Sequence, residues 1–322
     1  MDDHPGPMST TDDEVRWIEA ADIRVGVIPF GASLVAVEVP DRSGVPCNVI
    51  LSLPTAVDYR DRRLNHHLGA TVGRFANRIA GASFDLDGVT HRLVASEGDN
   101  TLHGGPAAWG RRDWTPTDHT ADSVALRLVD PDGTGGFPGT VDAELVYRVE
   151  PGILHIDARA VTDAPTVLNM ANHAYWNLAG TGPIDGQELA VAAGERLEVG
   201  TGLIPTGELV PTRISGLLGH SHWDDALVLE GGAARGEVAA AELRDRGSGR
   251  VMTVYTNQPA LQVYTADGLG PPFGPRWAVC LEAQGFPDAP HHPEFPSAVV
   301  RPGEHYHWWV RHEFTTADEQ RS

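Results

Sequence analysis

Glycine and proline interrupt this sequence at short intervals along its whole length. The 322-residue chain contains 36 glycines and 24 prolines, and both residue types break long helices. Many of the segments between them alternate apolar and polar residues with a period of two, which is the repeat of a half-buried β-strand. The sequence therefore predicts an antiparallel all-β protein, a large β-sandwich with little helix.

Two predicted hairpins show this pattern. Residues 144–149 and 153–161 alternate on either side of Glu150-Pro151-Gly152, which we expect to form the turn. In residues 83–94, Asp87-Gly88 supplies the positive φ angles of a tight turn between two strands. Four further strands are predicted, at residues 123–129, 250–256, 260–265 and 305–314.

The ends of the chain differ in composition from the rest. Residues 1–14 are polar, acidic and proline-containing, and are expected to be a disordered tail. Residues 315–322 are similar, and a flexible C-terminal tail is expected there. Residues 15–314 show no linker, low-complexity tract or clear short repeat, so they are predicted to form a single domain.

The charged residues exclude several classes of function. The net charge of −20 argues against nucleic acid and anionic membranes as partners. All 24 basic residues are arginine, so neither a Schiff-base lysine nor the lysine of a phosphate-binding P-loop is available.

The two cysteines, Cys47 and Cys280, suggest no disulfide framework. With no predicted signal peptide or membrane span, a cytoplasmic location is expected.

One carboxylate stands where a buried residue is expected. Glu282 directly follows the apolar run Trp277 to Leu281. Burying a bare carboxylate is costly, so a glutamate at this position must be paired or functional. Four other stretches carry polar side chains that a β-fold does not need, among them Asn77, Arg78, His103, His173, Asp224 and Asp225.

Metal and nucleophilic chemistry find little support in the sequence. The 15 histidines lack the spacing of known metal-ligand motifs. The pairs His66-His67 and His291-His292, and likewise His305 and His307, are predicted to lie on the surface or in loops. No G-x-S-x-G or G-x-G-x-x-G motif occurs. Acid–base chemistry on an uncharged polar ligand, such as a sugar, is what remains.

Seven segments in order along the chain carry a resemblance to a known family: GRFANRI, NTLHGG, FPGT, NHAYWNL, IPTG, LQVYT and CLEAQGFPDAPHHPEFP. Together they resemble the aldose 1-epimerase (galactose mutarotase) family from about Val15 to Phe314. The resemblance implies a galactose mutarotase-like supersandwich with an open sugar-binding cleft and no metal or organic cofactor. Trp176 and Ala266-Asp267 depart from the family pattern, and we expect them near the cleft.

The resemblance also implies a role for individual residues. Glu282, as a carboxylate, is expected to take the proton from the C1 hydroxyl of an aldohexose such as glucose or galactose. Protonated His173 is expected to give a proton to the ring oxygen, and His103 to bind near that oxygen. The expected substrate contacts are Asn77, Arg78, Asp224, Gln262 and Tyr175, although neighbouring Asp225 leaves the choice between the two aspartates open.

Three alternatives remain at this point. A hexose 6-phosphate 1-epimerase would need arginines in the cleft, which Arg111-Arg112 could supply. A non-catalytic sugar-binding module would share the fold. A glycosidase would use Asp224 and Glu282 as paired carboxylates but would leave the two histidines without a role. The oligomeric state, monomer or homodimer, is open.

Overall fold

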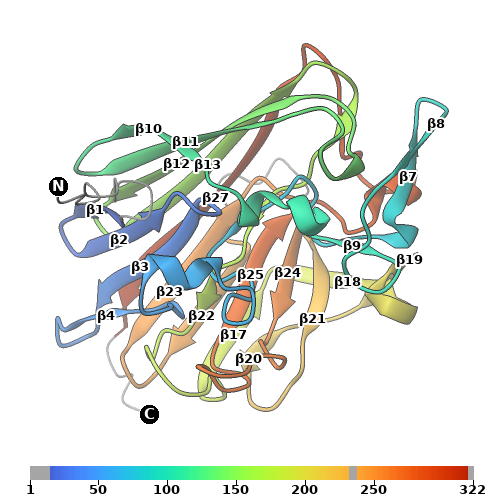
Figure 1. Ribbon diagram of the computed structural model, residues 1–322. Coiled ribbons are helices and arrows are strands. Elements are labelled where there is room, and N and C mark those ends of the chain that lie inside the picture. The colour runs from blue at the N-terminus through green and yellow to red at the C-terminus, as the bar shows by residue number, and fades with distance from the viewer. Residues whose placement is uncertain (1–14, 232–237, 318–322) are drawn as a thin grey trace, which may run out of the picture.

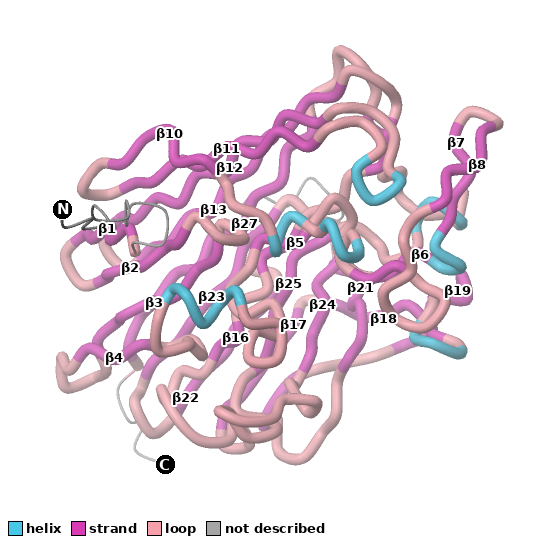
Figure 2. Tube along the Cα trace, in the orientation of Figure 1, coloured by secondary structure: helices cyan, strands magenta, loops and turns pink. Residues whose placement is uncertain are grey.

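The computed structural model describes residues 15–231 and 238–317, and the predicted N-terminal tail lies outside these ranges (Figure 1). Strands dominate it, and every helix in the described ranges is a 3-10 helix of three to five residues (Figure 2). The prediction of an all-β protein with little helix is therefore confirmed. No helix in this part of the chain is long and apolar enough to cross a membrane.

The largest sheet has nine strands in the order β10-β11-β12-β13-β27-β23-β22-β17-β20. All its pairings are antiparallel. The C-terminal strand β27 lies between β13 and β23, so it joins the two halves of the sheet. The strands are β10 (Thr115–His119), β11 (Ser123–Asp130), β12 (Val141–Glu150), β13 (Ile153–Thr162), β17 (Gln187–Val191), β20 (Ser215–Leu217), β22 (Ala241–Asp245), β23 (Arg250–Thr256) and β27 (Tyr306–Thr316).

Two smaller sheets pack against the inner face of the nine-stranded sheet. A six-stranded sheet has the order β16-β25-β24-β21-β18-β19, and a four-stranded sheet has the order β1-β2-β3-β4. One apolar cluster contains residues from all three sheets, as expected for a sandwich. The strands are β1 (Arg16–Ala20), β2 (Ile23–Ile28), β3 (Ser33–Pro40), β4 (Pro46–Asn48), β16 (Tyr175–Trp176), β18 (Ala193–Val199), β19 (Pro205–Pro211), β21 (Asp224–Leu229), β24 (Ala260–Tyr264) and β25 (Val279–Gln284).

Short elements complete the fold. Two-stranded pairs are formed by β5 (Thr71–Val72) with β15 (Ala171–Asn172), β6 (Arg78–Ile79) with β9 (Thr101–Leu102), β7 (Ser83–Leu86) with β8 (Val89–Arg92), and β14 (Thr166–Val167) with β26 (Val299–Val300). The β7–β8 hairpin projects from the body of the molecule (Figures 1 and 2). The 3-10 helices are η1 (Ala56–Arg60), η2 (Ala80–Ala82), η3 (Gly105–Ala107), η4 (Trp109–Arg111), η5 (Thr134–Gly136), η6 (Thr201–Leu203) and η8 (Ala289–His291).

Both predicted hairpins are confirmed. Pro151-Gly152 joins β12 to β13, and the apolar side chains of β13 from Leu154 to Ala160 are at most 2% exposed. Asp87 and Gly88, with φ angles of 52° and 80°, join β7 to β8. Strand β27 runs to Thr316, so residues 315 and 316 belong to the sheet, and residues 318–322 lie outside the described ranges.

Strands β24 and β25 of the six-stranded sheet are buried on both faces. Leu281 on β25 and Leu261 and Val263 on β24 belong to the sandwich core. The alternate residues Glu282 and Gln262 point to the other face, where they are 2% and 4% exposed. Loops between the small strand pairs cover this second face, and the polar side chains meet beneath them.

Gly69 fixes one of these covering loops. Its φ angle is +63°, and a Cβ atom there would lie 1.8 Å from the carbonyl oxygen of Leu34. The Gly69 backbone N–H donates to the carbonyl oxygen of His173 at 3.0 Å. Its carbonyl oxygen accepts from Asn172 Nδ2 at 2.9 Å. Only glycine can make this close approach, which ties the loop to the segment that carries His173.

We expect Gly69→Ala to lower the free energy of unfolding by about 3 kcal/mol or more, because the added methyl group meets backbone that cannot move aside. Gly44→Ala is the matched control. Gly44 has a φ angle of +80°, and a Cβ atom added there would have no other atom within 4 Å, so only the backbone penalty of about 1–2 kcal/mol applies. Urea unfolding of both variants measures the difference, and equal losses would contradict the close-approach argument.

Candidate active site

Strand register brings the first two polar side chains together. Glu282 on β25 lies directly opposite Gln262 on β24, and Gln262 lies opposite Ala226 on β21. Directly paired residues of an antiparallel sheet point to the same face. The period-two pattern of residues 260–265 therefore predicted the orientation of Gln262 correctly.

The same register separates the two neighbouring aspartates. Asp224 lies opposite Tyr264, and its Oδ1 accepts a hydrogen bond from Gln262 Nε2 at 2.7 Å. Asp225 points to the opposite side of the strand, where it forms a 2.8 Å ion pair with Arg196. Asp224 is thus the aspartate beside Glu282, which is the choice that the sequence left open.

Asn77 and His103 hold each other through reciprocal hydrogen bonds. The backbone N–H of Asn77 donates to His103 Nδ1 at 3.1 Å, and the backbone N–H of His103 donates to the Asn77 carbonyl oxygen at 3.0 Å. The Asn77 side chain then donates from Nδ2 to Gln262 Oε1 at 3.1 Å. A chain of amide hydrogen bonds therefore runs from Asn77 through Gln262 to Asp224.

Arg78 completes this side of the site. Its Nε and Nη2 atoms donate to the carboxylate of Glu97 at 2.6 and 3.0 Å, a bidentate pair. Its backbone N–H also donates to Asn77 Oδ1 at 3.0 Å. These bonds fix both the guanidinium and the neighbouring amide.

His173 lies against Glu282. Its Nε2 is 3.7 Å from Glu282 Oε1, and both side chains are buried. The ring of Tyr175 stacks on His173 with centroids 4.9 Å apart, while the tyrosine hydroxyl donates to the carbonyl oxygen of His66. On the other side of the imidazole, Cys280 Sγ is 3.5 Å from His173 Nδ1. The imidazole is therefore supported on one face and at Nδ1, with Nε2 directed to the carboxyl group.

These side chains line a single cavity of about 450 Å³, a size typical of small-molecule sites. All eight site residues expected from the sequence lie on its wall. They are Asn77, Arg78, His103, His173, Tyr175, Asp224, Gln262 and Glu282. The other lining residues are His66, His67, Glu97, Leu102, Arg111, Tyr264, Gly268 and Leu269.

Burial shifts the proton equilibria of the acid–base pair. Desolvation, reinforced by the charge of Asp224 and opposed by Arg78, raises the pKa of Glu282 to about 8. Desolvation lowers the pKa of His173 to about 4. In the ligand-free site at neutral pH, the proton therefore lies on Glu282 and His173 is neutral. This is the reverse of the ionisation expected from the sequence.

One group of residues has the side chains of a metal site. Ligand atoms of His103, His173 and Glu282 all lie within 4.8 Å of one another. However, His103 Nδ1 accepts the backbone N–H of Asn77, so the neutral ring carries its proton on Nε2. A metal-binding histidine instead donates its second N–H to an acceptor. The hydrogen bonding of His103 therefore suits a donor to a ligand oxygen better than a metal ligand.

Two histidines of the cavity wall, His66 and His67, were not predicted as site residues. His67 was predicted to be a surface or loop residue, and it does lie in a loop. Its side chain also forms part of the cavity wall, with its ring centroid 5.0 Å from that of His103 and 6.0 Å from that of His173. Its φ angle of 62° is unusual for a residue other than glycine. A non-glycine residue in this conformation leaves no periodic signal in the sequence.

The two departures from the family pattern lie outside the cavity. Trp176 was expected near the cleft, and it directly follows the lining residue Tyr175. Its own side chain is 1% exposed and packs against His312 and Phe314 in the sandwich core. Asp267 forms ion pairs with His222 and Arg276. Neither residue is part of the cavity wall.

The family profile described as "Aldose 1-epimerase" matches residues 13–313 of this chain. The chain belongs to the aldose 1-epimerase family. Galactose mutarotase from Bos taurus is 33% identical over 335 residues, covering 97% of this chain and 96% of that protein. Aldose 1-epimerase from Escherichia coli (strain K12) is 31% identical over 319 residues, covering 90% and 91%.

Solved structures agree with this family assignment. The GalM/aldose epimerase homologue from C. elegans superimposes with a TM-score of 0.88 at 27% identity, covering 95% of this chain and 100% of that one. Galactose 1-epimerase from Lactobacillus acidophilus NCFM gives a TM-score of 0.81 at 25% identity, covering 97% and 98%. As a member of this epimerase family, the protein is an isomerase with the galactose mutarotase-like fold that the resemblance implied.

We expect Asp224→Asn to lower the pKa of Glu282 below its value of about 8, because the charge of Asp224 opposes ionisation of Glu282. Titration of the Glu282 carboxyl carbon by ¹³C NMR measures this shift. Asp225→Asn is the control, because it removes an equal charge from the next residue, whose partner is Arg196 on the opposite face. It should leave the pKa of Glu282 unchanged. An unchanged Glu282 titration in Asp224→Asn would show that the two carboxylates do not interact.

Proposed function

We propose that this epimerase interconverts the α and β anomers of an aldohexose, with Glu282 and His173 as its acid–base pair. The observation that carries the proposal is the 3.7 Å approach of His173 Nε2 to Glu282 Oε1 in the wall of a polar cavity. Two proton-transfer groups this close can serve adjacent oxygens of one sugar ring. The C1 hydroxyl and the ring oxygen are such a pair.

Ring opening needs one proton to leave and one to arrive. Glu282, as the carboxylate, takes the proton from the C1 hydroxyl, and protonated His173 gives a proton to the ring oxygen as the C1–O5 bond breaks. The C1–C2 bond then rotates, and the C5 hydroxyl attacks the other face of the aldehyde. On closure His173 takes its proton back and Glu282 returns its proton to O1, so both groups are restored.

The directions of the two pKa shifts are consistent with a cycle that begins with one proton transfer from Glu282 to His173. Burial raises the pKa of Glu282 and lowers that of His173, so the site without sugar favours a protonated Glu282 beside a neutral His173. Movement of that proton to His173 produces the carboxylate and the imidazolium together, without exchange with solvent. A hydroxyl group or a water between Oε1 and Nε2 can carry it.

The remaining wall residues suit the recognition of hydroxyl groups. Asp224 accepts hydrogen bonds, Asn77 and Gln262 offer amides, and Arg78 donates from a guanidinium held by Glu97. His103 Nε2–H suits a bond to an oxygen near the reacting centre, where it would stabilise developing negative charge. Hydrogen bonds among these side chains hold the donors and acceptors in place before a sugar binds.

A non-catalytic sugar-binding module is less consistent with the site. Binding hydroxyl groups needs donors and acceptors but no group with a strongly shifted pKa. Glu282 is 2% exposed, and its Oε2 has no hydrogen-bond partner in the described part of the chain. A buried carboxyl group with an unpaired oxygen destabilises the fold. A role in proton transfer explains why the protein has a glutamate at this position.

We expect Glu282→Gln to lower kcat by roughly 10²–10⁴-fold, because the amide cannot accept the C1 hydroxyl proton. His173→Asn should lose a similar factor. The measurement is polarimetry on freshly dissolved α-D-glucose and α-D-galactose, corrected for spontaneous mutarotation. Ordinary activity in Glu282→Gln would overturn the assignment of this residue, and no acceleration of any aldose by the wild type would overturn the proposed function.

Glu282→Gln should also change the dependence of stability on pH. A carboxyl group whose folded pKa is raised to about 8 contributes stability below its unfolded pKa of about 4.5, and this stability is lost as pH rises toward 8. The glutamine variant lacks this loss, so it should become more stable than wild type by a few kcal/mol at pH 8 and by much less at pH 5. Urea unfolding at the two pH values tests this, and a pH-independent difference would contradict it.

A further inference from the structure

One guanidinium in the cavity wall has no counter-charge. Arg111, at the end of η4, lines the same cavity as Glu282 and is half-buried. In the described ranges both of its hydrogen bonds come from Nη2 and are long, at 3.4 Å to the carbonyl oxygen of Asn65 and 3.4 Å to Nε2 of His67. No carboxylate of residues 15–231 or 238–317 lies within ion-pair distance of it.

Several other arginines near the cavity or in concave parts of the surface are paired with carboxylates, unlike Arg111. Arg112, the next residue, forms an ion pair with Asp130, and Arg63 forms one with Asp61 at 2.6 Å. A wider concavity of about 640 Å³ on β12, β13 and β27 also contains arginines. Each of these has a carboxylate partner, in the pairs Arg148–Glu150, Arg159–Asp157 and Arg311–Glu313.

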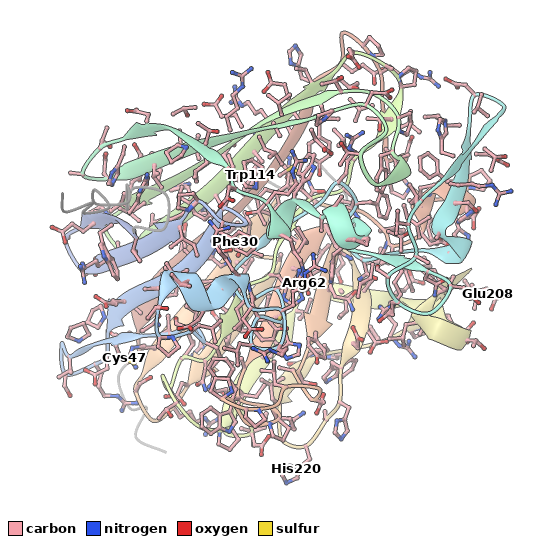
Figure 3. The ribbon with its side chains drawn as sticks, in the orientation of Figure 1. Phe30, Cys47, Arg62, Trp114, Glu208 and His220 are labelled. Carbon is pink, nitrogen blue, oxygen red and sulfur yellow. The ribbon has the colours of Figure 1, made fainter. Side chains whose placement is uncertain are left out.

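A second cation adds to the positive potential at Arg111. Burial, reinforced by the charge of the exposed Arg62, lowers the pKa of Arg111. In the described part of the chain Arg62 has no ion-pair partner. Its side chain lies near the centre of Figure 3, in front of the strands that carry Gln262 and Glu282.

This arrangement is unfavourable without a ligand. A half-buried guanidinium has lost part of its hydration and gains nothing from a nearby cation. The chain as a whole has a net charge of −20 and 44 acidic residues, so carboxylates are abundant on it. An anion in the cavity would offset the lost hydration of Arg111 and would be attracted by both guanidinium groups.

We propose that the cavity accepts aldoses that bear an anionic group, a carboxylate or a phosphate, and that Arg111 binds this group. This inference rests on the proposed epimerase function, because the sugar ring must occupy the same cavity. Arg111 also holds the imidazole of His67 through Nη2. An anion that engages the free Nε and Nη1 atoms leaves that contact in place.

The test compares anionic and neutral aldoses in wild type and in Arg111→Gln. D-glucuronate carries a carboxylate, D-glucose 6-phosphate carries a phosphate, and D-glucose is the neutral reference. Exchange between the anomeric protons, followed by saturation-transfer NMR, gives kcat/KM for each sugar. Arg63→Gln is the control, since it removes an equal charge from an exposed residue that is paired with Asp61 outside the cavity.

We expect Arg111→Gln to lower the ratio of kcat/KM for an anionic aldose to that for glucose by tenfold or more, and Arg63→Gln to leave this ratio unchanged. Raising the ionic strength should lower the same ratio in wild type. A response confined to one of the two anions identifies the carboxylate or the phosphate as the group that is bound.

Two outcomes would overturn the inference and leave the epimerase function standing. One is wild-type turnover of glucose with neither turnover nor competitive inhibition by either anionic aldose. The other is an equal loss on all three sugars in Arg111→Gln, which would show that Arg111 only supports His67. Absence of turnover on every sugar would instead contradict the proposed function itself.

Discussion

The site depends on one carboxyl group buried in the face of a β-sheet. Glu282 is in the middle of β25, with apolar neighbours on the core side and covering loops on the other. Removal from water favours the protonated form of Glu282 and raises its pKa to about 8. A general acid or base works best when its pKa lies near the working pH. The His173 imidazole, shifted the opposite way, makes the exchange between the two groups possible.

Position within the sheet explains why this geometry is so well defined. Gln262 and Asp224 are on adjacent antiparallel strands, and cross-strand register rather than loop conformation sets their distance from Glu282. The loops then contribute His103 and Asn77, which are locked to each other by backbone hydrogen bonds. A slip of one residue in register would turn all the strand-borne groups into the core.

Periodicity predicted eight of the strands, both hairpins and the face on which Gln262 lies, because these follow from local alternation and turn chemistry. The membership of the site came from the family resemblance, which named residues but not their spacing. The choice of Asp224 over Asp225 required the register, since adjacent residues always face opposite ways. The sequence offered Arg111 and Arg112 together as possible cleft arginines, and only the structure separates them, because Arg111 lines the cavity and Arg112 pairs with Asp130. His67 could not be found from the sequence, because it lies in a loop and owes its place to contacts distant along the chain.

The central place of β27 has a consequence for how the molecule forms. The strand pairs with β13 on one side and β23 on the other, so neither half of the nine-stranded sheet meets the other until the C-terminal strand has docked. Until β27 docks, β13 and β23 each present an unpaired sheet edge, and such an edge is open to association with other chains. Closure is therefore a late, non-local event, of the kind that slows folding.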